Sequence, residues 1–277
     1  MKRVLVIGDD SYIGKSFEAF ARDSFEIKMV NSMNNAWQSV DFTGYDSVLH
    51  CAGIAHVKQI RKMESLYYKV NCDLAVAVAN KAKSSGVKQF VFLSSMAVYG
   101  TSRSEIDETT IPEPDPRDFY GCSKLKAEQE LQKLADDKYK LCIVRPPMVY
   151  GKGCKGNFPR LCKLAKKTPI IPDYPNSRSM IFIDNLCYFL QNAMFSESRG
   201  FFLPQNSEYV NTTQLIKLIA AKYSKQIITT KVFNPFVKLM TKHITLFSKL
   251  FGDLIYMKSD NEYSVIDFDE SIKMSLE

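Results

Sequence analysis

The sequence predicts an α/β protein in which a doubly wound parallel sheet is followed by a small C-terminal lobe. Short apolar runs alternate with helical patterns through the first half of the chain, as in parallel sheets that are covered by helices on both faces. A turn with two glycines joins the first apolar run to the first helical pattern. After Gly151 the chain changes to basic segments that contain glycine and proline, which indicates a separate lobe.

The elements of the large domain follow from hydrophobic periodicity. The run KRVLVIG, at 2–8, predicts the first strand, and SYIGKSFEAFARD, at 11–23, predicts an amphipathic helix. Only about a dozen residues separate Asn31 from Tyr45, too few for the usual crossover of helix and strand, so we expect an abbreviated third unit. Further strands are expected at 26–31, 45–53, 88–95 and 140–146, and helices near 64–85 and 120–135.

The second half of the chain predicts a lobe that is interrupted by one return to the large domain. MIFIDNLCYFLQNAM, at 180–194, is typical of a strand that leads into a helix. We therefore expect a large domain of residues 1–151 with 181–200 returning to it, and a lobe of residues 152–180 and 201–277.

Two further helical patterns lie in the lobe. TTQLIKLIAAKY, at 212–223, predicts a helix with a threonine cap. FNPFVKLMTKHITLFSKLF, at 233–251, is basic and amphipathic. For this second pattern, packing within the lobe is favoured over contact with a membrane surface, because apolar helical stripes usually face a core.

Composition excludes several classes of protein. The 277 residues are 45% hydrophobic and 24% charged, which is typical of a globular chain. The seven cysteines form no CxxC pair and the three histidines form no HxxxH pair, so we expect neither a disulfide framework nor a metal site. No apolar run reaches the length of a signal peptide core or a membrane span, so we expect a cytoplasmic protein without an integral membrane segment.

The net charge of +7 is concentrated in one segment. Seven basic residues lie between Lys152 and Arg178, against Asp173 alone. The segment is either a solvated helix face or a site for a small polyanion. Nucleic acid is not an expected partner, because aromatic side chains for base stacking are not interleaved with the charges.

The first turn predicts a dinucleotide site. In VLVIGDDSYIG, Gly8 permits the tight turn, Gly14 lets helix and strand approach, and the helix N-terminus can hold a pyrophosphate. This is the pattern of a Rossmann-type sheet that binds NAD or NADP. Ser11 occupies the middle glycine position, which the backbone accommodates if its φ is negative, and Tyr12 and Ile13 complete the predicted cofactor turn.

The end of the second strand does not choose between NAD and NADP. An acidic residue there holds the ribose 2′-hydroxyl of NAD, and a basic one suits the 2′-phosphate of NADP. The sequence has Asn31, which does neither and only removes an acid that would repel a phosphate.

A tyrosine and a lysine four residues apart predict the catalytic pair. Tyr120 and Lys124 begin a helix and project from one face of it. The ammonium would favour the tyrosinate, which makes the phenol an acid or base below its usual pKa of about 10. The segment SSMAVYG ends the preceding strand and supplies Ser95.

These motifs in this order, with VRPPMVYGKG at 144–153, resemble the extended short-chain dehydrogenase/reductase superfamily of nucleotide-sugar epimerases, dehydratases and reductases. The resemblance covers almost the whole chain. It implies that Tyr120 is the acid or base, that Lys124 lowers its pKa and binds the nicotinamide ribose, and that Ser95 holds the reacting oxygen. It also places Asn71, Ala52 and Gly53 beside the cofactor.

The same resemblance gives the basic segment a function. Asn157 matches the family position that binds the diphosphate of a UDP-sugar, and Arg178 matches the arginine that clamps the same phosphates. It further implies a homodimer that is formed by the helices near 64–85 and 120–135.

The two residues after Ser95 restrict the reaction. A 4,6-dehydratase of this superfamily has Asp-Glu there, whereas this chain has Met96 and Ala97, which cannot transfer a proton. Hydride transfer with one protonation remains. The closest resemblance is to bacterial 4-reductases of UDP-4-keto-6-deoxy-N-acetylhexosamines in surface-polysaccharide synthesis, whose relatives often bear the label UDP-glucose 4-epimerase.

Two alternatives stay open. A 4-epimerase with retained NAD fits the same motifs, although Met148 stands where many epimerases have an asparagine, which favours the reductase. A non-catalytic nucleotide-binding regulator is the other alternative, and the presence of Ser95, Tyr120 and Lys124 argues against it.

Overall fold

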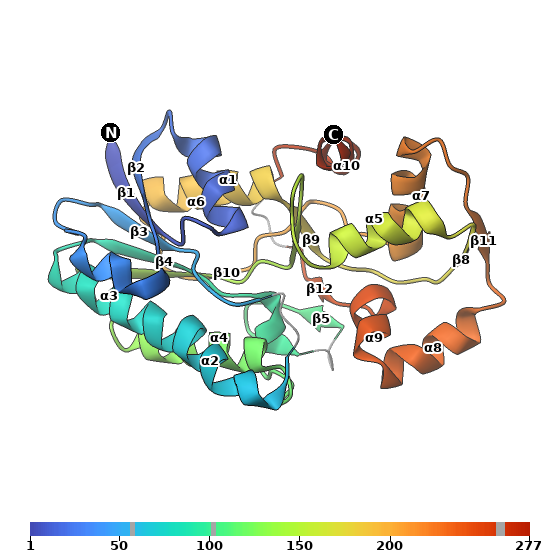
Figure 1. Cartoon of the computed structure of the whole chain (residues 1–277), viewed down its shortest axis with the longest axis horizontal. Coiled ribbons are helices and arrows are strands. Elements are labelled where there is room, and N and C mark those ends of the chain that lie inside the picture. Colours follow the sequence, from blue (N-terminus) through green and yellow to red (C-terminus); the bar gives the residue numbers. More distant parts are fainter. Residues whose placement is uncertain (56–58, 101–103, 259–263) are drawn as a thin grey trace. The chain divides into compact units, whose positions relative to one another are not determined.

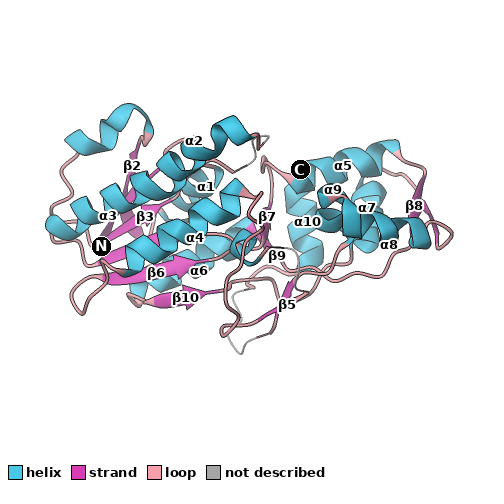
Figure 2. Cartoon of the chain, turned by 90° about the horizontal axis from the view of Figure 1, so that it is seen from below, coloured by secondary structure: helices cyan, strands magenta, loops and turns pink. Residues whose placement is uncertain are grey.

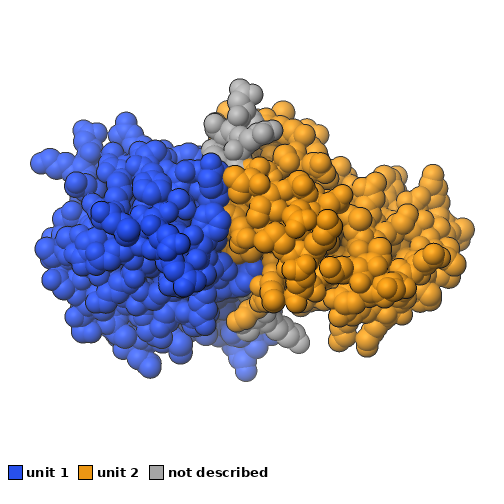
Figure 3. Space-filling view, turned by 90° about the horizontal axis from the view of Figure 1, so that it is seen from above, with its two compact units in different colours: residues 1–100, 111–146, 186–204 blue, residues 101–110, 147–185, 205–277 orange. Residues whose placement is uncertain are grey.

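The chain folds into two compact units (Figure 3). The computed structural model describes residues 1–55, 59–100, 104–258 and 264–277. Unit 1 comprises residues 1–100, 111–146 and 186–204, and unit 2 comprises residues 101–110, 147–185 and 205–277. The chain thus leaves unit 1 after Pro146, a few residues before the expected limit at Gly151, and 101–110 belongs to unit 2.

Unit 1 contains a parallel sheet of six strands in the order β10-β6-β4-β3-β1-β2 (Figure 1). Every neighbouring pair in it is parallel. The strands are β1 (Lys2–Ile7), β2 (Phe25–Val30), β3 (Ser47–His50), β4 (Gln89–Leu93), β6 (Lys140–Val144) and β10 (Gly200–Phe202). The chain passes from β1 to β2 on one side and then to β3 on the other side, which creates a topological switch point beside β1.

Helices cover both faces of this sheet, as the sequence predicts. In Figure 1, α1 and the part of α6 that belongs to unit 1 lie on one face, and α2, α3 and α4 lie on the other. Figure 2 views the second group from below, with the strands behind it. The helices are α1 (Tyr12–Ala21), α2 (Glu64–Tyr68), α3 (Leu74–Ser84), α4 (Phe119–Gln132) and α6 (Ile183–Phe195), and a π-helical turn, Lys69–Asp73, joins α2 to α3.

The connection from β2 to β3 is abbreviated, as the sequence predicts. A 3-10 segment, Met33–Ser39, occupies the link from β2 to β3 in place of a helix and a strand. Trp37 and Phe42 in this link are buried and belong to the core cluster. Two large aromatic side chains therefore bury the sheet surface that a crossover helix would otherwise have covered.

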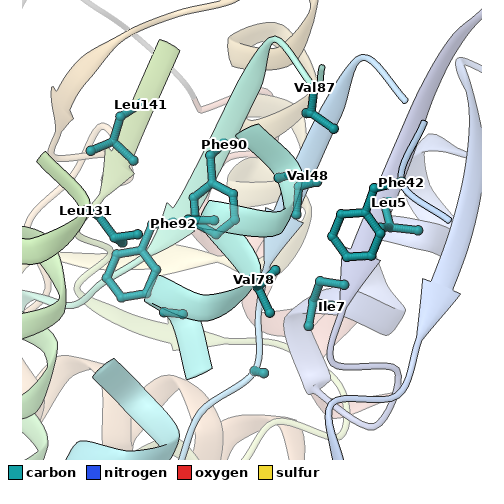
Figure 4. Packing of buried hydrophobic residues seen from close by; sticks show 14 of the residues in the cluster. Leu5, Ile7, Phe42, Val48, Val78, Val87, Phe90, Phe92, Leu131 and Leu141 are labelled. Atoms are coloured by element: carbon teal, nitrogen blue, oxygen red, sulfur yellow. The ribbon is translucent and has the colours of Figure 1, made fainter. Parts of the chain in front are cut away.

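The core of unit 1 lies between the sheet and the helices α3 and α4 (Figure 4). Leu5, Val48 and Phe90 come from three adjacent strands, and Val78 and Leu131 come from the helices. Their complete burial provides the main driving force for assembling the sheet and its helical layer. Small residues on α3 let that helix approach the sheet closely, namely Ala75, Ala79 and Ala82.

A buried ion pair joins α4 to the strand ends. Arg145, directly after β6, donates to both carboxylate oxygens of Glu128 on α4, from Nε at 3.0 Å and from Nη2 at 2.6 Å. The same carboxylate accepts a hydrogen bond from Ser94, and Arg145 Nη1 donates to the hydroxyl of Tyr99 at 2.6 Å. The side chain of Glu128 is 0% exposed and that of Arg145 is 7% exposed. Both charges are therefore satisfied inside the protein rather than by water.

Unit 2 consists of three short parallel strand pairs with helices around them. The pairs are β7 (Met148–Tyr150) with β9 (Met180–Phe182), β8 (Ile170–Pro172) with β11 (Ile228–Thr230), and β5 (Glu105–Ile106) with β12 (Ile255–Tyr256). The helices are α5 (Asn157–Lys167), α7 (Thr212–Lys222), α8 (Asn234–His243), α9 (Thr245–Phe251) and α10 (Phe268–Leu276). Among the described residues, no helix is long and apolar enough to cross a membrane.

Two expectations for unit 2 need correction. The cap of α7 is Asn211, whose side chain accepts a hydrogen bond from Gln214 N, and not a threonine, because Thr212 is already helical and buried. The basic amphipathic segment at 233–251 forms two helices that meet at Ile244. Val237 is the buried residue of α8, so most of that helix does not pack into the lobe.

The buried ion pair predicts a large effect on stability. Glu128→Gln keeps the size of the side chain but leaves the Arg145 guanidinium buried without its counter-charge. We expect the free energy of unfolding to fall by about 3–5 kcal/mol, measured by urea denaturation.

The matched control is Glu130→Gln on the same helix, which removes the surface ion pairs with Lys126 and Lys133. This change is expected to cost much less, because water screens these charges and solvates the groups that lose their partner. If both variants lost the same free energy of unfolding, the burial of the pair between Glu128 and Arg145 would not be what makes it important for stability.

Candidate cofactor and catalytic site

The sequence-predicted cofactor and catalytic residues lie in unit 1, at the carboxyl ends of its strands. They come from the β1–α1 turn, the ends of β2, β3 and β4, the π-helical turn and the start of α4. Strands on the two sides of a topological switch point leave a crevice at that edge, where α/β proteins bind their ligands. The fold therefore brings together residues that are more than a hundred positions apart in sequence.

The β1–α1 turn requires both of its glycines. Gly8 has φ +112°, and a Cβ on it would lie 2.9 Å from the backbone nitrogen of Ala52. A Cβ on Gly14 would lie 2.5 Å from the hydroxyl of Ser11. Ser11 has φ −72°, as its non-glycine identity requires, and its hydroxyl caps α1 by accepting a hydrogen bond from Gly14 N at 3.0 Å. The departure from the glycine pattern thus provides a helix cap.

A carboxylate lies at the end of β2, although the sequence there offered only Asn31. The side-chain amide of Asn31 donates to Asp9 Oδ1 at 3.0 Å and to Oδ2 at 3.3 Å. Its carbonyl oxygen accepts a hydrogen bond from Met33 N at 2.7 Å, which fixes the orientation of the amide. Position 31 itself carries no acid, as the sequence shows, but Asp9 from the first turn brings a carboxylate to its side chain. Because Asp9 directly follows Gly8 in the predicted cofactor turn, the sequence already placed a carboxylate near the cofactor.

Asn71 holds the loop that follows β3. Its side chain accepts a hydrogen bond from Ile54 N at 2.8 Å and donates to Ile54 O at 3.1 Å and to the Ser123 hydroxyl at 3.0 Å. A Cβ on Gly53 would lie 3.0 Å from Asn71 Oδ1 and 3.4 Å from Lys124 Nζ. The buried amide thus ties the loop of Ala52 and Gly53 to α4. In this structure Asn71 positions the predicted cofactor loop from the π-helical turn, a distortion that is frequent at functional sites.

The loop after β4 brings Ser95 to the start of α4. Ser95 caps the 3-10 turn Met96–Tyr99 by accepting a hydrogen bond from Ala97 N at 3.1 Å. A Cβ on Gly121 would lie 2.6 Å from Ala97 O, so the first turn of α4 touches this loop. Met96 is buried in the core, where it fills space and offers no polar group.

Lys124 is directed at strand β4. Its ammonium donates to the backbone oxygen of Leu93 at 2.8 Å and lies 4.5 Å above the ring centre of Phe92. Burial lowers the pKa of Lys124 to about 8, and nearby acidic groups offset only part of that effect. The neighbouring His50 is also buried, which lowers its pKa to about 3 and keeps its imidazole neutral beside the ammonium.

The pKa of Tyr120 differs from the sequence-based expectation. Burial raises the pKa of this half-buried phenol to about 12, and a hydrogen bond with the side chain of Ser95 offsets part of the increase. Lys124 is not among the groups that shift the pKa of Tyr120 in this structure, where its ammonium donates to β4, so the expectation that Lys124 lowers this pKa stays a prediction. Ser95 is the predicted catalytic residue whose side chain opposes the rise in the pKa of Tyr120.

The two predicted substrate residues belong to unit 2. Asn157 is the first residue of α5 and follows Gly156, which has φ +95°. The Arg178 guanidinium donates from Nη1 to the backbone oxygens of Gly252 at 2.6 Å and Ser248 at 3.3 Å, at the end of α9. Burial lowers the pKa of Arg178 to about 10. Arg178 therefore has a structural contact in addition to its predicted one with phosphate.

Sequence reasoning missed Glu128. It lies on α4 one turn after Lys124, and this spacing was a usable signal, since residues four apart share a helix face. Its partner Arg145 precedes two prolines, and no local pattern links it to α4.

Two epimerases have sequences similar to that of this chain. A UDP-glucose 4-epimerase from Vibrio cholerae is 34% identical over 191 residues, which are 64% of this chain and 57% of that protein. The chain thus matches less than two thirds of the Vibrio enzyme. N-acetyl-alpha-D-glucosaminyl-diphospho-ditrans,octacis-undecaprenol 4-epimerase from Escherichia coli O157:H7 is 26% identical over 271 residues, covering 90% of this chain and 81% of that protein.

Solved structures share the fold. A UDP-N-acetylglucosamine 4-epimerase from Methanobrevibacter ruminantium M1, in complex with UDP-N-acetylmuramic acid, superposes with a TM-score of 0.75 at 17% identity, covering 99% of this chain and 97% of that one. A dTDP-4-dehydrorhamnose reductase from Bacillus anthracis, in complex with NADP, gives 0.66 at 22% identity, covering 84% and 85%. At these sequence identities the similarity shows the fold alone. An epimerase and a reductase both have this fold, so it does not distinguish the two reactions.

The family assignment rests on the greater part of the chain. A model of the NAD dependent epimerase/dehydratase family matches residues 4–190, from the first strand through the helix that returns to unit 1. This range contains the glycine turn, Ser95 and the pair Tyr120 and Lys124. The chain therefore belongs to the NAD-dependent epimerase/dehydratase family, and its fold is that of the extended short-chain dehydrogenases/reductases.

Proposed function

We propose that the protein reduces the C4 ketone of a UDP-4-keto-6-deoxy-N-acetylhexosamine. The observation that supports this proposal is that the loop of Ser95 packs on the first turn of α4, which carries Tyr120, while Met96 and Ala97 beside Ser95 have no transferable proton. Reduction of a ketone needs one hydride and one proton, whereas 4,6-elimination needs further acid and base groups.

The protonation state of Tyr120 supports reduction. With its pKa raised to about 12, the phenol carries its proton at neutral pH, as an ordinary tyrosine does, and that proton is available for transfer. A nicotinamide cofactor held by the β1–α1 turn would supply the hydride. Tyr120 then gives its proton to the carbonyl oxygen as that oxygen gains charge, and the Ser95 hydroxyl orients the same oxygen. The first step of an epimerase is oxidation, which instead requires the phenolate as a base.

Lys124 supports the cofactor in this scheme. An ammonium has three N–H donors, and the Leu93 carbonyl accepts one of them. By the family resemblance, the remaining donors bind the ribose next to the nicotinamide. Glycine at position 53 leaves the ammonium uncovered on that side, since any side chain there would contact it.

A 4-epimerase is the second candidate, because both named relatives carry that activity in their names. One of them acts on a UDP-sugar and the other on a sugar diphosphate attached to a polyprenol. Such an enzyme would retain its NAD and consume none. In either reaction Asn157 and Arg178 are the proposed ligands of the diphosphate, and a homodimer through α2, α3 and α4 remains part of the proposal.

We further propose that NAD is the preferred cofactor. An acid at the end of the second strand binds the ribose hydroxyls of NAD and repels the 2′-phosphate of NADP. Asp9 provides this acid, and Asn31 holds it in place through two hydrogen bonds.

The reductase proposal predicts consumption of nicotinamide. With UDP-4-keto-6-deoxy-N-acetylglucosamine, the protein should oxidise NADH in a one-to-one ratio, measured by the loss of nicotinamide absorbance. Tyr120→Phe should lower kcat by about 100-fold or more because the proton donor is lost. Binding of NADH should be unchanged in this variant.

The control is Tyr223→Phe, which removes the hydroxyl of an exposed tyrosine in unit 2 and should keep full activity. Turnover at the normal rate by Tyr120→Phe would contradict the mechanism. Absence of NADH and NADPH oxidation, together with interconversion of UDP-N-acetylglucosamine and UDP-N-acetylgalactosamine, would establish the epimerase instead.

The pKa of Lys124 predicts the alkaline limit of activity. The ammonium is charged below a pKa of about 8 and becomes neutral above it, so the positive charge that binds the ribose is lost as pH rises. We expect kcat/KM to fall through this region, about tenfold per pH unit. A profile that stays flat well above this pKa would show that the charge of Lys124 is not needed.

The position of Asp9 predicts the cofactor preference. Fluorescence titration should give an affinity for NADH at least roughly tenfold higher than for NADPH, and Asp9→Asn should remove most of this difference by relieving charge repulsion. The control is Asp10→Asn, a neutralisation at the next, exposed residue, which should leave the ratio unchanged. Equal preference in the wild type and in Asp9→Asn would exclude Asp9 as the selective group.

A further inference from the structure

An unusual apolar surface lies on α8 and the turn before it. Four large apolar side chains there are strongly exposed, namely Val232 (80%), Phe233 (46%), Phe236 (56%) and Leu239 (55%). Single exposed apolar residues are common on soluble proteins, but four within eight positions need an explanation. We call residues 231–243 the docking segment.

The packing of unit 2 explains only one face of this segment. Val237 is buried, and Phe236 makes an edge contact with Phe247 of α9, with ring centres 6.2 Å apart. Figure 1 shows α8 and α9 as two short helices side by side, which accounts for that contact. Phe236 and Leu239 follow at helical spacing on the face that remains exposed. The lobe therefore fixes the helix without covering its apolar stripe.

Basic residues accompany the apolar stripe. Lys238 and Lys242 are one helical turn apart and exposed, and Lys231 is exposed in the turn before the helix. Among the residues that the structure describes, no carboxylate forms an ion pair with these three lysines. The sequence has no acidic residue between Glu208 and Asp253, but it has seven lysines there, at positions 217, 222, 225, 231, 238, 242 and 249.

This combination matches one kind of partner. An interfacial helix presents Phe and Leu to the boundary between headgroups and acyl chains and places lysines beside them, where they attract anionic lipids. A protein partner would need an acidic surface opposite these lysines, and in the test below it would be recognised by the absence of vesicle binding. A nucleic acid would not need the aliphatic side chains of Val232 and Leu239.

We propose that the docking segment binds the surface of an anionic lipid bilayer. The charge of the lysines draws unit 2 to the surface, and the exposed apolar side chains then enter the interfacial region. Binding is peripheral and reversible, because a single short helix buries little apolar area. The inference goes beyond the proposed function and is the same for a reductase and for an epimerase.

The test is co-sedimentation of the full chain with lipid vesicles. We expect binding to vesicles of phosphatidylcholine mixed with phosphatidylglycerol, little binding to vesicles of phosphatidylcholine alone, and a decrease as NaCl is raised. Lys238→Glu with Lys242→Glu should lower the bound fraction by at least roughly tenfold, and Phe236→Ser with Leu239→Ser should do the same.

Two control variants match these changes elsewhere on the surface. The variant Lys28→Glu with Lys88→Glu reverses the charge at two exposed positions of unit 1. The variant Ile111→Ser with Val265→Ser removes two exposed apolar side chains. Both should bind vesicles like the wild type. Circular dichroism and thermal unfolding of every variant separate a loss of binding from a loss of folding. The assay contains no sugar substrate, so its outcome is independent of the proposed reaction.

Three results would overturn the proposal. The first is the absence of binding to the anionic vesicles. The second is binding that is equal for neutral vesicles or is unchanged in the docking-segment variants. The third is a wild-type protein that is oligomeric by light scattering and does not bind vesicles, together with a variant Phe236→Ser with Leu239→Ser that is monomeric. In that case a second copy of the chain covers the surface.

Discussion

The arrangement of the catalytic residues depends on one buried ion pair. Glu128 belongs to α4 and Arg145 follows β6, and both side chains are out of contact with water. A buried charge without its partner is far more costly than an exposed one, so the two elements cannot separate without a large loss of stability. The same carboxylate binds Ser94, which precedes the 3-10 turn after β4, and Arg145 Nη1 binds Tyr99, the last residue of that turn. The pair thus fixes α4, which carries Tyr120, against the loop that carries Ser95.

Burial is the common cause of the unusual acidities at this site. It raises the pKa of Tyr120 and lowers those of Lys124 and His50, in each case by opposing the charged form. A lysine one turn from a tyrosine would favour the tyrosinate only if its ammonium faced the phenol. Here it faces the carbonyl of Leu93, so the buried phenol retains its proton. The same burial thus decides the protonation state of each of the three side chains.

The sequence was informative where the chemistry of a residue is local and silent where a contact spans the fold. Gly8 and Gly14 were recognisable because a tight turn between strand and helix excludes side chains, and both meet that limit in the structure. The abbreviated link after β2 followed from chain length alone. No spacing rule brings Asp9 to Asn31 or Glu128 to Arg145, because each pair joins elements whose approach is decided by the order of strands in the sheet. The direction of Lys124 was likewise invisible, since helical periodicity gives the face of a side chain but not its hydrogen-bond acceptor.

The docking segment shows the same limit in unit 2. An amphipathic pattern establishes that a helix has an apolar face, and it does not identify what covers that face. The sequence analysis expected this face to pack within the lobe because apolar helix faces are usually buried. Val237 is buried, whereas Phe236 and Leu239 are exposed. The distinguishing information was in the charges, because a face that packs into a core is bordered by residues of both signs. A stretch that carries lysines without a single acid from Glu208 to Asp253 indicates instead that the partner itself is negatively charged.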